Sequence, residues 1–511
     1  MEVSMSEGKP PAPVEIELKL LFPPDARVLI ERHPVLKAAV LPPQAKHLVT
    51  TYYDTPDLAL SRTGLSLRVR RTGKDRVQTL KSQGAEDGLA SGRGEWEWPV
   101  KADTPDLRLL AEIPASVMRS FPAGDVKPVW VSDIHWTAWL LRYESATVEL
   151  VIDEGVVRAD GGEVPVREME LELKEGPVGA LYGLALEMQY TLPLRLGVET
   201  KAARGYRLLT GALPEAVHVQ KPAAGKKTTA QDGFRSVVGA CLSALAGNLP
   251  AAETGEPEGI HQMRVANRRL RAVLRLFADH LEASVAGVFE DELRRIGREL
   301  GEARDRDVFC LETLPATFPD GQSEEWRRLL MDAAMEKRTG AHEQLREELE
   351  GPALTALVLS LAAWAEGQPF SGAGASVTEP LSDVAPVLLD KMARRVRRRG
   401  RHIDRLSMEE LHSLRKALKR LRYSADCCTG LYPHRTVKSW LKHCRHLQAL
   451  LGEINDAVVS QNLVVAMSEE RIELAPAAGA LSLWSEKRRR KAIGKLSGAW
   501  DEFQDATPFW R

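Results

Sequence analysis

The chain has 511 residues, of which 70 are lysine or arginine and 71 are aspartate or glutamate, giving a formal net charge of −1. This length is sufficient for two or more domains with complete hydrophobic cores, and the near-neutral total excludes a uniformly basic or acidic protein. No stretch approaches the roughly 18 consecutive apolar residues of a membrane-spanning helix, and residues 1–13 lack the apolar core of a signal peptide. The five cysteines show neither a disulfide framework nor a metal-ligand spacing, so free thiols in a reducing, cytoplasmic compartment are expected.

Residues 14–20 (Val-Glu-Ile-Glu-Leu-Lys-Leu) alternate apolar and charged side chains without interruption. In a β-strand successive side chains point to opposite faces, so Glu15, Glu17 and Lys19 line one face and the apolar residues line the other. Two carboxylates and an ammonium on one face can hold a divalent cation and a phosphate side by side.

The same alternation returns several times before residue 200. A solvated sheet face would produce it in any single strand. Acidic and basic strands in this number, each with an apolar reverse face, favour instead a closed antiparallel barrel with a polar interior and a covered outer wall. Buried charges must be paired or bind a metal, and a metal with a polyanion meets that need. The later segments are Leu65–Arg70, Thr79–Lys81, Arg93–Trp98, Val148–Asp153 and Glu168–Lys174.

The character of the chain changes near residue 212, from short alternating segments to Leu/Ala/Arg-rich segments with helical period. Residues 211–227 contain prolines, a glycine and a Lys-Lys pair and are expected to form a linker. A loop rich in Gly, Ser and Pro at 367–386 divides the helical half. The predicted organisation is a β domain of residues 14–210 and a helical domain of residues 228–505, with repeats of about 228–366 and 387–505.

The helical half contains an internal duplication with an offset of 151 residues. His261 and the basic residues after it recur from His412 onward (412 − 261 = 151), and Gly301 matches Gly452 at the same offset (452 − 301 = 151). Shared spacing over this span predicts two copies of one helical unit, with each histidine opening an equivalent helix.

The basic side chains of these two helices fall on one face at 100° per residue, opposite an apolar face. Crowding cations without interleaved acids is unfavourable, which favours polyanion binding over a solvated helix surface. Nucleic acid is less expected than polyphosphate, because the stripes lack the aromatic platforms of single-strand binding. The two histidines could equally be capping or surface side chains. The predicted polyphosphate contacts are His261, Arg264, Arg268, Arg271, His412, Arg415, Lys419 and Arg422.

On these motifs, residues 14 to about 210 resemble the CYTH family of triphosphate tunnel metalloenzymes, which is marked by an acidic-x-acidic-x-Lys first strand. Residues 228 to about 505 resemble the CHAD family, a helical domain with basic, histidine-containing repeats that is associated with polyphosphate binding. Tandem proteins of this kind resemble bacterial inorganic triphosphatases. The expected fold is α+β and multidomain: an eight-stranded antiparallel β-barrel tunnel with flanking helices, followed by an all-α bundle with an internal duplication.

The resemblance implies roles for individual side chains. Metal binding would fall to Glu15, Glu17, Asp153, Glu170 and Glu172. Phosphate oxygens would be bound by Lys19, Arg68, Arg70, Lys81, Arg142, Lys201 and Arg204. The catalytic set would be Glu15, Glu17, Lys19, Arg68, Arg70, Lys81, Glu170 and Glu172. Further interior residues, without assigned roles, would be Arg93, Glu95, Glu149 and Glu168.

The implied activity is hydrolysis of inorganic triphosphate to diphosphate and orthophosphate with Mg²⁺ or Mn²⁺, since hard cations suit oxygen ligands and no His/Cys set suggests zinc. Water, activated by a second metal or by an interior carboxylate, would attack in line. One alternative keeps the tunnel but takes a nucleoside or thiamine triphosphate, as a hydrolase or a cyclase. Another is a non-catalytic polyphosphate-binding scaffold. No purine-reading set is apparent, which favours the inorganic substrate, and the intact carboxylates argue against a scaffold.

Overall fold

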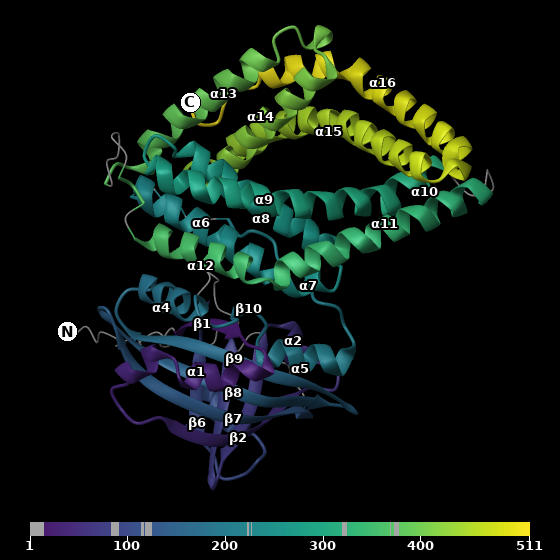
Figure 1. Cartoon of the computed structure of the whole chain (residues 1–511). Coiled ribbons are helices and arrows are strands. Elements are labelled where there is room, and N and C mark those ends of the chain that lie inside the picture. The colour runs from purple at the N-terminus through teal and green to yellow at the C-terminus, as the bar shows by residue number, and fades with distance from the viewer. Residues whose placement is uncertain are drawn as a thin grey trace. The chain divides into compact units, whose positions relative to one another are not determined.

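The computed structural model describes residues 15–82, 91–113, 117, 125–221, 224–225, 227–318, 324–367, 369–371 and 378–511. Its internal contacts divide the chain into two compact units (Figure 1). One unit runs to Pro214 and also takes in Val358–Glu366, and the other comprises Glu215–Leu357 and Gly367–Arg511. The described strands all belong to the first unit, and the second is helical.

The first unit is built on an antiparallel sheet of ten strands in the order β10-β1-β9-β8-β7-β2-β3-β4-β6, with β5 paired to β1 outside this path. Two hairpins join the long strands β7, β8 and β9 at its centre. The strands are β1 (Glu15–Leu21), β2 (Gln44–Asp54), β3 (Leu65–Thr72), β4 (Asp75–Ser82), β5 (Ser91–Arg93), β6 (Glu95–Pro99), β7 (Lys127–Tyr143), β8 (Ala146–Ala159), β9 (Gly162–Glu175) and β10 (Arg195–Gly197).

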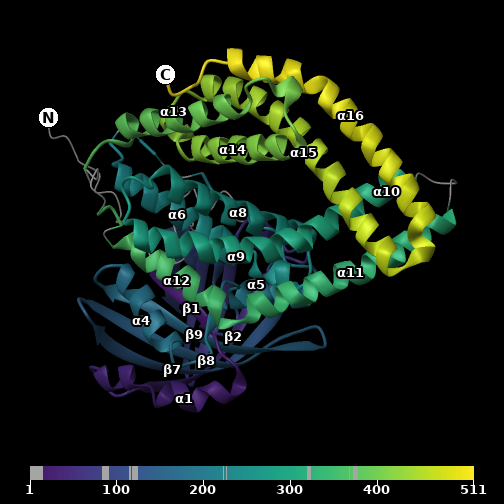
Figure 2. The same ribbon diagram turned by 45° about the horizontal axis from the view of Figure 1, so that its top comes forward.

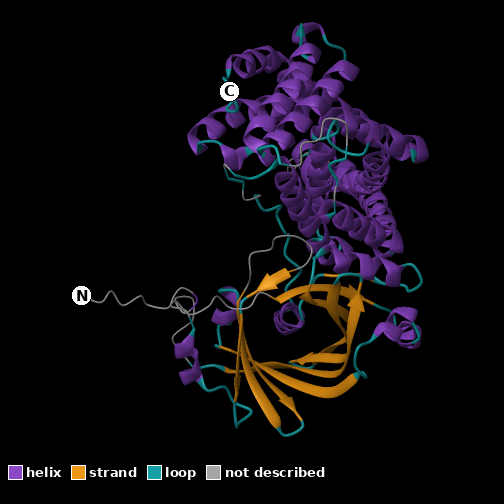
Figure 3. Cartoon of the chain, turned by 90° about the vertical axis from the view of Figure 1, so that its left-hand side faces the viewer, coloured by secondary structure: helices purple, strands orange, loops and turns teal. Residues whose placement is uncertain are grey.

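The prediction of an antiparallel β domain with flanking helices is confirmed, but the expected count of eight strands and the closed barrel were wrong. The sheet is strongly curved (Figure 3), yet within the described residues no ladder joins β10 to β6. The stretch 91–99 pairs first with β1 and then, after Gly94, with β4. A period-2 pattern reports which face a side chain takes and not which strand lies next to it, so it could not give strand number or closure.

Two helices cover opposite faces of this sheet. Helix α4 (Gly179–Gln189) packs on β9, and its Gly183 lies against the Tyr143 ring on the apolar face. Helix α5 (Lys201–Thr210) packs on β7, β8 and β9 from the charged face, where Tyr206 joins a core with Tyr52 and Trp130. The short helices α1 (Arg27–Glu31) and α2 (Ala59–Arg62) follow β1 and β2. Lys201, the first residue of α5, therefore lies on the charged face of the sheet.

The helical unit consists mainly of antiparallel helix pairs, and α15 runs beside α16 (Figure 2). A π-helical turn, Phe309–Thr313, joins α9 to α10. The helices are α6 (Ala230–Gly247), α7 (Leu249–Glu253), α8 (Pro257–Leu276), α9 (Ala283–Val308), α10 (Leu314–Thr317), α11 (Glu324–Glu350), α13 (Leu381–Arg399), α14 (Met408–Cys427), α15 (His434–Glu470) and α16 (Ala475–Asp505). Helix α12 (Pro352–Glu366) begins in this unit, and its residues Val358–Glu366 belong to the first unit.

The duplication is visible in the starts of the helices. Helices α8 and α14 begin 151 residues apart (408 − 257 = 151), and so do α9 and α15 (434 − 283 = 151). The prediction that His261 and His412 open these helices was wrong by one turn, because each helix begins four residues earlier. A proline occupies the first position of α8, and Ser407 forms a capping box with Glu410 at α14, so both helices start before the basic stripe.

The loop predicted at 367–386 is shorter in the structure. Helix α13 begins at Leu381 and includes Pro386. All five cysteines are described; each is buried and none forms a disulfide. In the described part of the chain, no helix combines the length and apolar character needed to cross a membrane.

Candidate functional site

The register of β1 against β9 sets charged residues opposite one another. Lys19 lies opposite Glu170, and Glu17 lies opposite Glu172. Directly paired residues share a face of the sheet, so the charged faces of the two strands coincide. The polar interior begins with this pairing.

Three carboxylates and two lysines meet on this face. Lys19 Nζ lies 3.3 Å from Glu168 Oε2 and 3.1 Å from Glu170 Oε1. Lys201 Nζ, from the start of α5, lies 2.7 Å from Asp153 Oδ2, 2.8 Å from Glu168 Oε2 and 3.0 Å from Glu170 Oε1. Lys19 is 9% exposed, Asp153 5% and Glu168 0%. This interior carboxylate cluster is therefore held by two ammonium groups shielded from solvent.

The surroundings favour the charged forms of Glu168 and Lys201, whereas burial raises the pKa of Asp153. Burial alone would raise the pKa of Glu168, but Lys19, Lys201 and Arg204 outweigh it and lower that pKa to about 2. Arg204 Nη2 donates to Glu168 Oε1 at 2.6 Å. Burial would lower the pKa of Lys201, yet the neighbouring carboxylates raise it well above its ordinary value. The charged forms of Glu168 and Lys201 are therefore stabilised by their oppositely charged neighbours.

A second group, mainly cationic, lies on strands β2 to β6. Arg68 Nη2 and Lys81 Nζ bind the two oxygens of Glu95, at 3.2 and 2.8 Å. The Nε atoms of Arg68 and Arg70 are buried and have no hydrogen-bond partner among the described residues. Burial would raise the pKa of Tyr52, but Arg68, Arg70 and Lys201 lower it overall. Arg68, Arg70 and Lys201 therefore all lower the pKa of the same tyrosine, Tyr52.

A third, more exposed group continues the interior along β8 and β9. Lys174 Nζ lies 2.6 Å from Glu172 Oε1 and 3.1 Å from Glu149 Oε2. Burial, followed by the neighbouring Glu149 and Glu17, raises the pKa of Glu172 against the opposing effect of Lys174. Carboxylates of three strands, β1, β8 and β9, therefore approach one another in this group.

The carboxylate cluster has the donor set of a divalent-cation site. One oxygen each from Asp153, Glu168 and Glu170 lies within 4.8 Å of the others. Asp153 Oδ1 is buried and has no hydrogen-bond partner in the described residues. Carboxylate oxygens in this number fit a hard cation, so the residues present fit the metal that the sequence predicts.

The structure brings most of the predicted interior residues onto one face. Side-chain contacts join Lys19, Asp153, Glu170, Lys201 and Arg204, while Arg68 and Lys81 share Glu95. Arg142 is exposed near the end of β7, opposite Thr147, away from the carboxylate cluster. The side chains of Glu15 and Arg93 lie outside the described residues.

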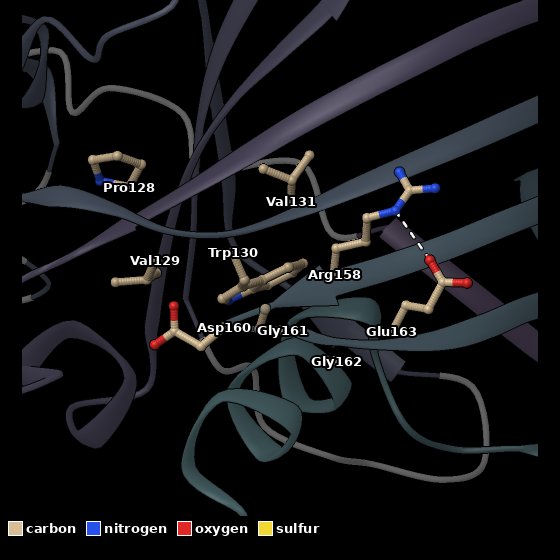
Figure 4. Close-up of a pocket in the computed structure, with 10 residues that line it drawn as sticks. Pro128, Val129, Trp130, Val131, Arg158, Asp160, Gly161, Gly162 and Glu163 are labelled. Atoms are coloured by element: carbon tan, nitrogen blue, oxygen red, sulfur yellow. Dashed lines mark hydrogen bonds and ion pairs between the residues drawn. The ribbon is translucent and has the colours of Figure 1, made fainter.

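The sequence patterns assigned no role to Glu168 and did not identify Tyr52 as a site residue. Glu168 is the carboxylate that three cations share, and its place in the Glu168–Lys174 alternation was the available signal. Tyr52 stacks on Trp130 with ring centroids 3.6 Å apart, in a strand that the pattern did not identify. A separate surface pocket of about 740 Å³ is lined by residues 128–131 and 158–163 (Figure 4). It contains none of the predicted site residues.

In the helical unit, α8 packs against α14 and brings the two basic stripes together. Arg264 Nη1 lies 2.8 Å from Asp305 Oδ1, and the equivalent Arg415 Nη2 lies 3.7 Å from Asp456 Oδ1. Between these pairs, burial followed by Arg268, Arg415 and Arg264 lowers the pKa of Lys419 to about 6. Three arginines and one lysine from two repeats therefore share one partly buried surface, called here the central basic surface (Arg264, Arg268, Arg415 and Lys419).

The other predicted polyphosphate contacts lie around this surface with different partners. Arg422 donates to Gln448 and to Asp426, and His412 Nδ1 lies 3.0 Å from Asn455 Oδ1. Burial, with Arg304 next, lowers the pKa of His261.

These features define a β unit with an acid/base interior and a duplicated basic helical unit on one chain. Residues 14–206 match the CYTH domain family, and residues 236–465 match the CHAD domain family. The chain thus carries a CYTH domain followed by a CHAD domain, as its sequence motifs predict.

Three similar proteins match shares of different length of this chain. An inorganic triphosphatase of Haemophilus influenzae is 30% identical over 196 residues, which are 38% of this chain and 54% of the relative, so the match spans about half of that protein's length. An uncharacterized protein of Mycobacterium tuberculosis is 27% identical over 453 residues, 82% of each chain. The crystal structure of the CHAD domain from Ricinus communis matches with 25% identity and a TM-score of 0.47, covering 58% of this chain and 97% of that one.

Proposed function

We propose that the protein is a metal-dependent hydrolase that cleaves inorganic triphosphate to diphosphate and orthophosphate. Catalysis is assigned to residues 14–210, and residues 228–505 are assigned to polyphosphate binding. The observation that carries the proposal is the convergence of Lys19 and Lys201 on the buried carboxylates of Asp153, Glu168 and Glu170. The Haemophilus influenzae relative, named an inorganic triphosphatase, supports the substrate class.

The cationic side of the interior would bind the phosphate chain. Arg68 and Arg70 have buried Nε donors that suit phosphate oxygens, and an arginine can bind two oxygens at once. Lys81 shares Glu95 with Arg68, which keeps both cations directed at the same region. These side chains would screen the charge that repels a nucleophile from the terminal phosphorus.

The acidic side would hold the metal. Asp153, Glu168 and Glu170 each have an oxygen within 4.8 Å of the others, and Glu17 and Glu172 continue this set along β1 and β9. Bound Mg²⁺ or Mn²⁺ would supply charge stabilisation for the leaving diphosphate. The carboxylates also orient Lys19 and Lys201, so that the ammonium groups stay in the interior when substrate enters.

Orthophosphate release from triphosphate, with and without Mg²⁺ or Mn²⁺, tests this function. Glu17→Gln is expected to lower turnover by about a hundredfold or more, because a single preorganised charge contributes on this scale. The matched control is Glu163→Gln, which changes an exposed carboxylate of β9 that pairs with Arg158. Equal turnover in wild type and Glu17→Gln would contradict the site. Faster release from ATP than from triphosphate would shift the assignment to an organic triphosphate.

Polyphosphate binding is assigned to the central basic surface. Arg264 and Arg415 each have one acidic partner, but the effects of Arg268, Arg415 and Arg264 on Lys419 show cations that repel one another. A bound polyanion would relieve that repulsion.

A further inference from the structure

Two neighbouring tyrosines of strand β2 are buried to a similar degree but lie on opposite faces of the sheet. Tyr52 is 3% exposed and Tyr53 is 5% exposed. The Tyr53 hydroxyl donates a hydrogen bond to the backbone oxygen of Asp103, so its proton has an acceptor. Tyr52 lies opposite Arg68 of β3 and opposite Trp130 of β7, on the charged face. The two hydroxyls of one strand therefore have different surroundings.

The ring of Tyr52 is held in one orientation by its packing. It stacks on the Trp130 indole with ring centroids 3.6 Å apart and planes 16° apart. Trp130 in turn meets Tyr206 of α5 edge to face, with centroids 6.0 Å apart. The backbone of α5 lies directly against the indole, because a Cβ on Gly205 would be 2.3 Å from it. This packing fixes the direction in which the Tyr52 hydroxyl points.

Cations surround the Tyr52 hydroxyl. Arg68 donates a hydrogen bond to it, and Arg70 and Lys201 act on it as further positive charges. A tyrosine hydroxyl also donates its own proton, but neither a guanidinium nor an ammonium can accept a hydrogen bond. Within the described ranges, no residue accepts a hydrogen bond from Tyr52. An acceptor is therefore missing where three positive charges meet.

Two further donors on this face are unused. The Nε atoms of Arg68 and Arg70 are both buried without a hydrogen-bond partner in the described residues. Arg70 lies opposite Thr50, two residues before Tyr52, so the unused donors come from adjacent positions of β2 and β3. An anion with several oxygens, such as a phosphate chain, would supply acceptors to all three donors. A metal ion would not, because it accepts no hydrogen bond and is repelled by the cations.

We propose that Tyr52 binds the substrate directly, with its hydroxyl donating a hydrogen bond to a phosphate oxygen that Arg68 and Arg70 also contact. This inference rests on the proposed hydrolysis of triphosphate and adds a neutral donor to the cationic side of that site. A neutral donor contributes a contact without adding to the repulsion among the cations. The stack of Tyr52 on Trp130 then serves substrate binding, because it fixes the direction of the donor.

The neighbouring tyrosines supply a matched pair of variants. Tyr52→Phe removes the hydroxyl and keeps the ring that stacks on Trp130, and Tyr53→Phe makes the same change on the other face. With Mg²⁺, Tyr52→Phe is expected to raise KM for inorganic triphosphate about tenfold and to change kcat by less than about twofold, because it removes a hydrogen bond to a charged acceptor. Tyr53→Phe is expected to keep the wild-type KM and to lower Tm, because it loses the bond to Asp103. Cooperative unfolding of both variants shows that the fold is kept.

Direct binding separates this inference from the proposed function. Triphosphate is titrated calorimetrically in EDTA into full-length protein that carries Arg264→Glu and Arg415→Glu, which remove binding at the central basic surface. Adding Tyr52→Phe to this protein should raise the dissociation constant about tenfold, and adding Tyr53→Phe should not change it.

Equal dissociation constants with and without Tyr52→Phe would overturn the inference, while metal-dependent turnover by the wild type would leave the proposed hydrolysis standing. An equal rise in KM in Tyr52→Phe and Tyr53→Phe would also overturn it, because the effect would then come from the packing of β2. A wild type that neither binds nor hydrolyses triphosphate would overturn the proposed function and this inference together.

Discussion

The β unit and the helical unit both gather cations, but they balance them differently. In the β interior, Lys19, Lys201 and Arg204 each contact buried carboxylates. On the central basic surface, Arg264 and Arg415 have one acid each, and Lys419 lies among like charges. The proposed site for a metal and a phosphate chain needs both signs of charge, whereas the proposed polyanion surface needs only positive charge.

The two regions should therefore respond differently to loss of a charge. Removing a cation from the β interior takes away one of the partners that balance the buried carboxylates, which is costly. Removing one from the helical surface relieves repulsion and affects mainly the ligand.

The largest effect is expected for Lys201→Met. It leaves Asp153, Glu168 and Glu170 without their shared ammonium and should lower the free energy of unfolding by about 3–5 kcal/mol. Mn²⁺ should then raise Tm more than in the wild type, because a cation can replace the lost charge. Thermal unfolding with and without Mn²⁺ measures both. Lys174→Met, at a partly exposed lysine, is the control and should cost about 1 kcal/mol or less.

A smaller effect on stability, but a clear effect on binding, is expected for Arg264→Glu combined with Arg415→Glu. Polyphosphate retention should fall strongly at low salt and less at high salt, since screening weakens both variant and wild type. Triphosphate turnover should remain at the wild-type level. Retention that is unchanged at low salt would place the binding surface elsewhere.

The smallest expected effect is on proton binding by Lys419. Lys419 has a pKa of about 6 in the folded protein against 10.5 ordinarily, so the unfolded chain binds more protons between these values and stability rises with pH across that window. A bound polyanion would restore the charged form, so binding at pH 8 should take up a proton. Calorimetry in buffers of different ionisation enthalpy measures this uptake. Lys419→Met should abolish it, and a variant that still takes up the same proton would contradict the assignment.

Much of the interior could be predicted because one alternating segment is enough to assign a face. Glu17 and Lys19, Arg68 and Arg70, and Glu170 and Glu172 all follow from period 2. Register could not be predicted, because nothing in β1 alone sets Lys19 opposite Glu170. The contact of Lys201 with three carboxylates depends on helix α5 packing against the charged face, which is a tertiary feature.

In the helical unit, the 151-residue offset predicted equivalent helices, and their starts confirm it. The two repeats nevertheless differ at one pair of equivalent positions, where Arg275 and Asp426 carry opposite charges. A sequence repeat predicts that two segments share a backbone fold. It does not predict the contacts of each side chain, because these depend on how α8 packs against α14.

The most direct test measures two quantities on the same three proteins: orthophosphate release from triphosphate with Mg²⁺ or Mn²⁺, and polyphosphate retention at low salt. Glu17→Gln is expected to lose turnover and keep retention. Arg264→Glu with Arg415→Glu is expected to keep turnover and lose retention. Loss of both properties in both variants, or of neither in Glu17→Gln, would contradict the separation of catalysis and binding between the two units.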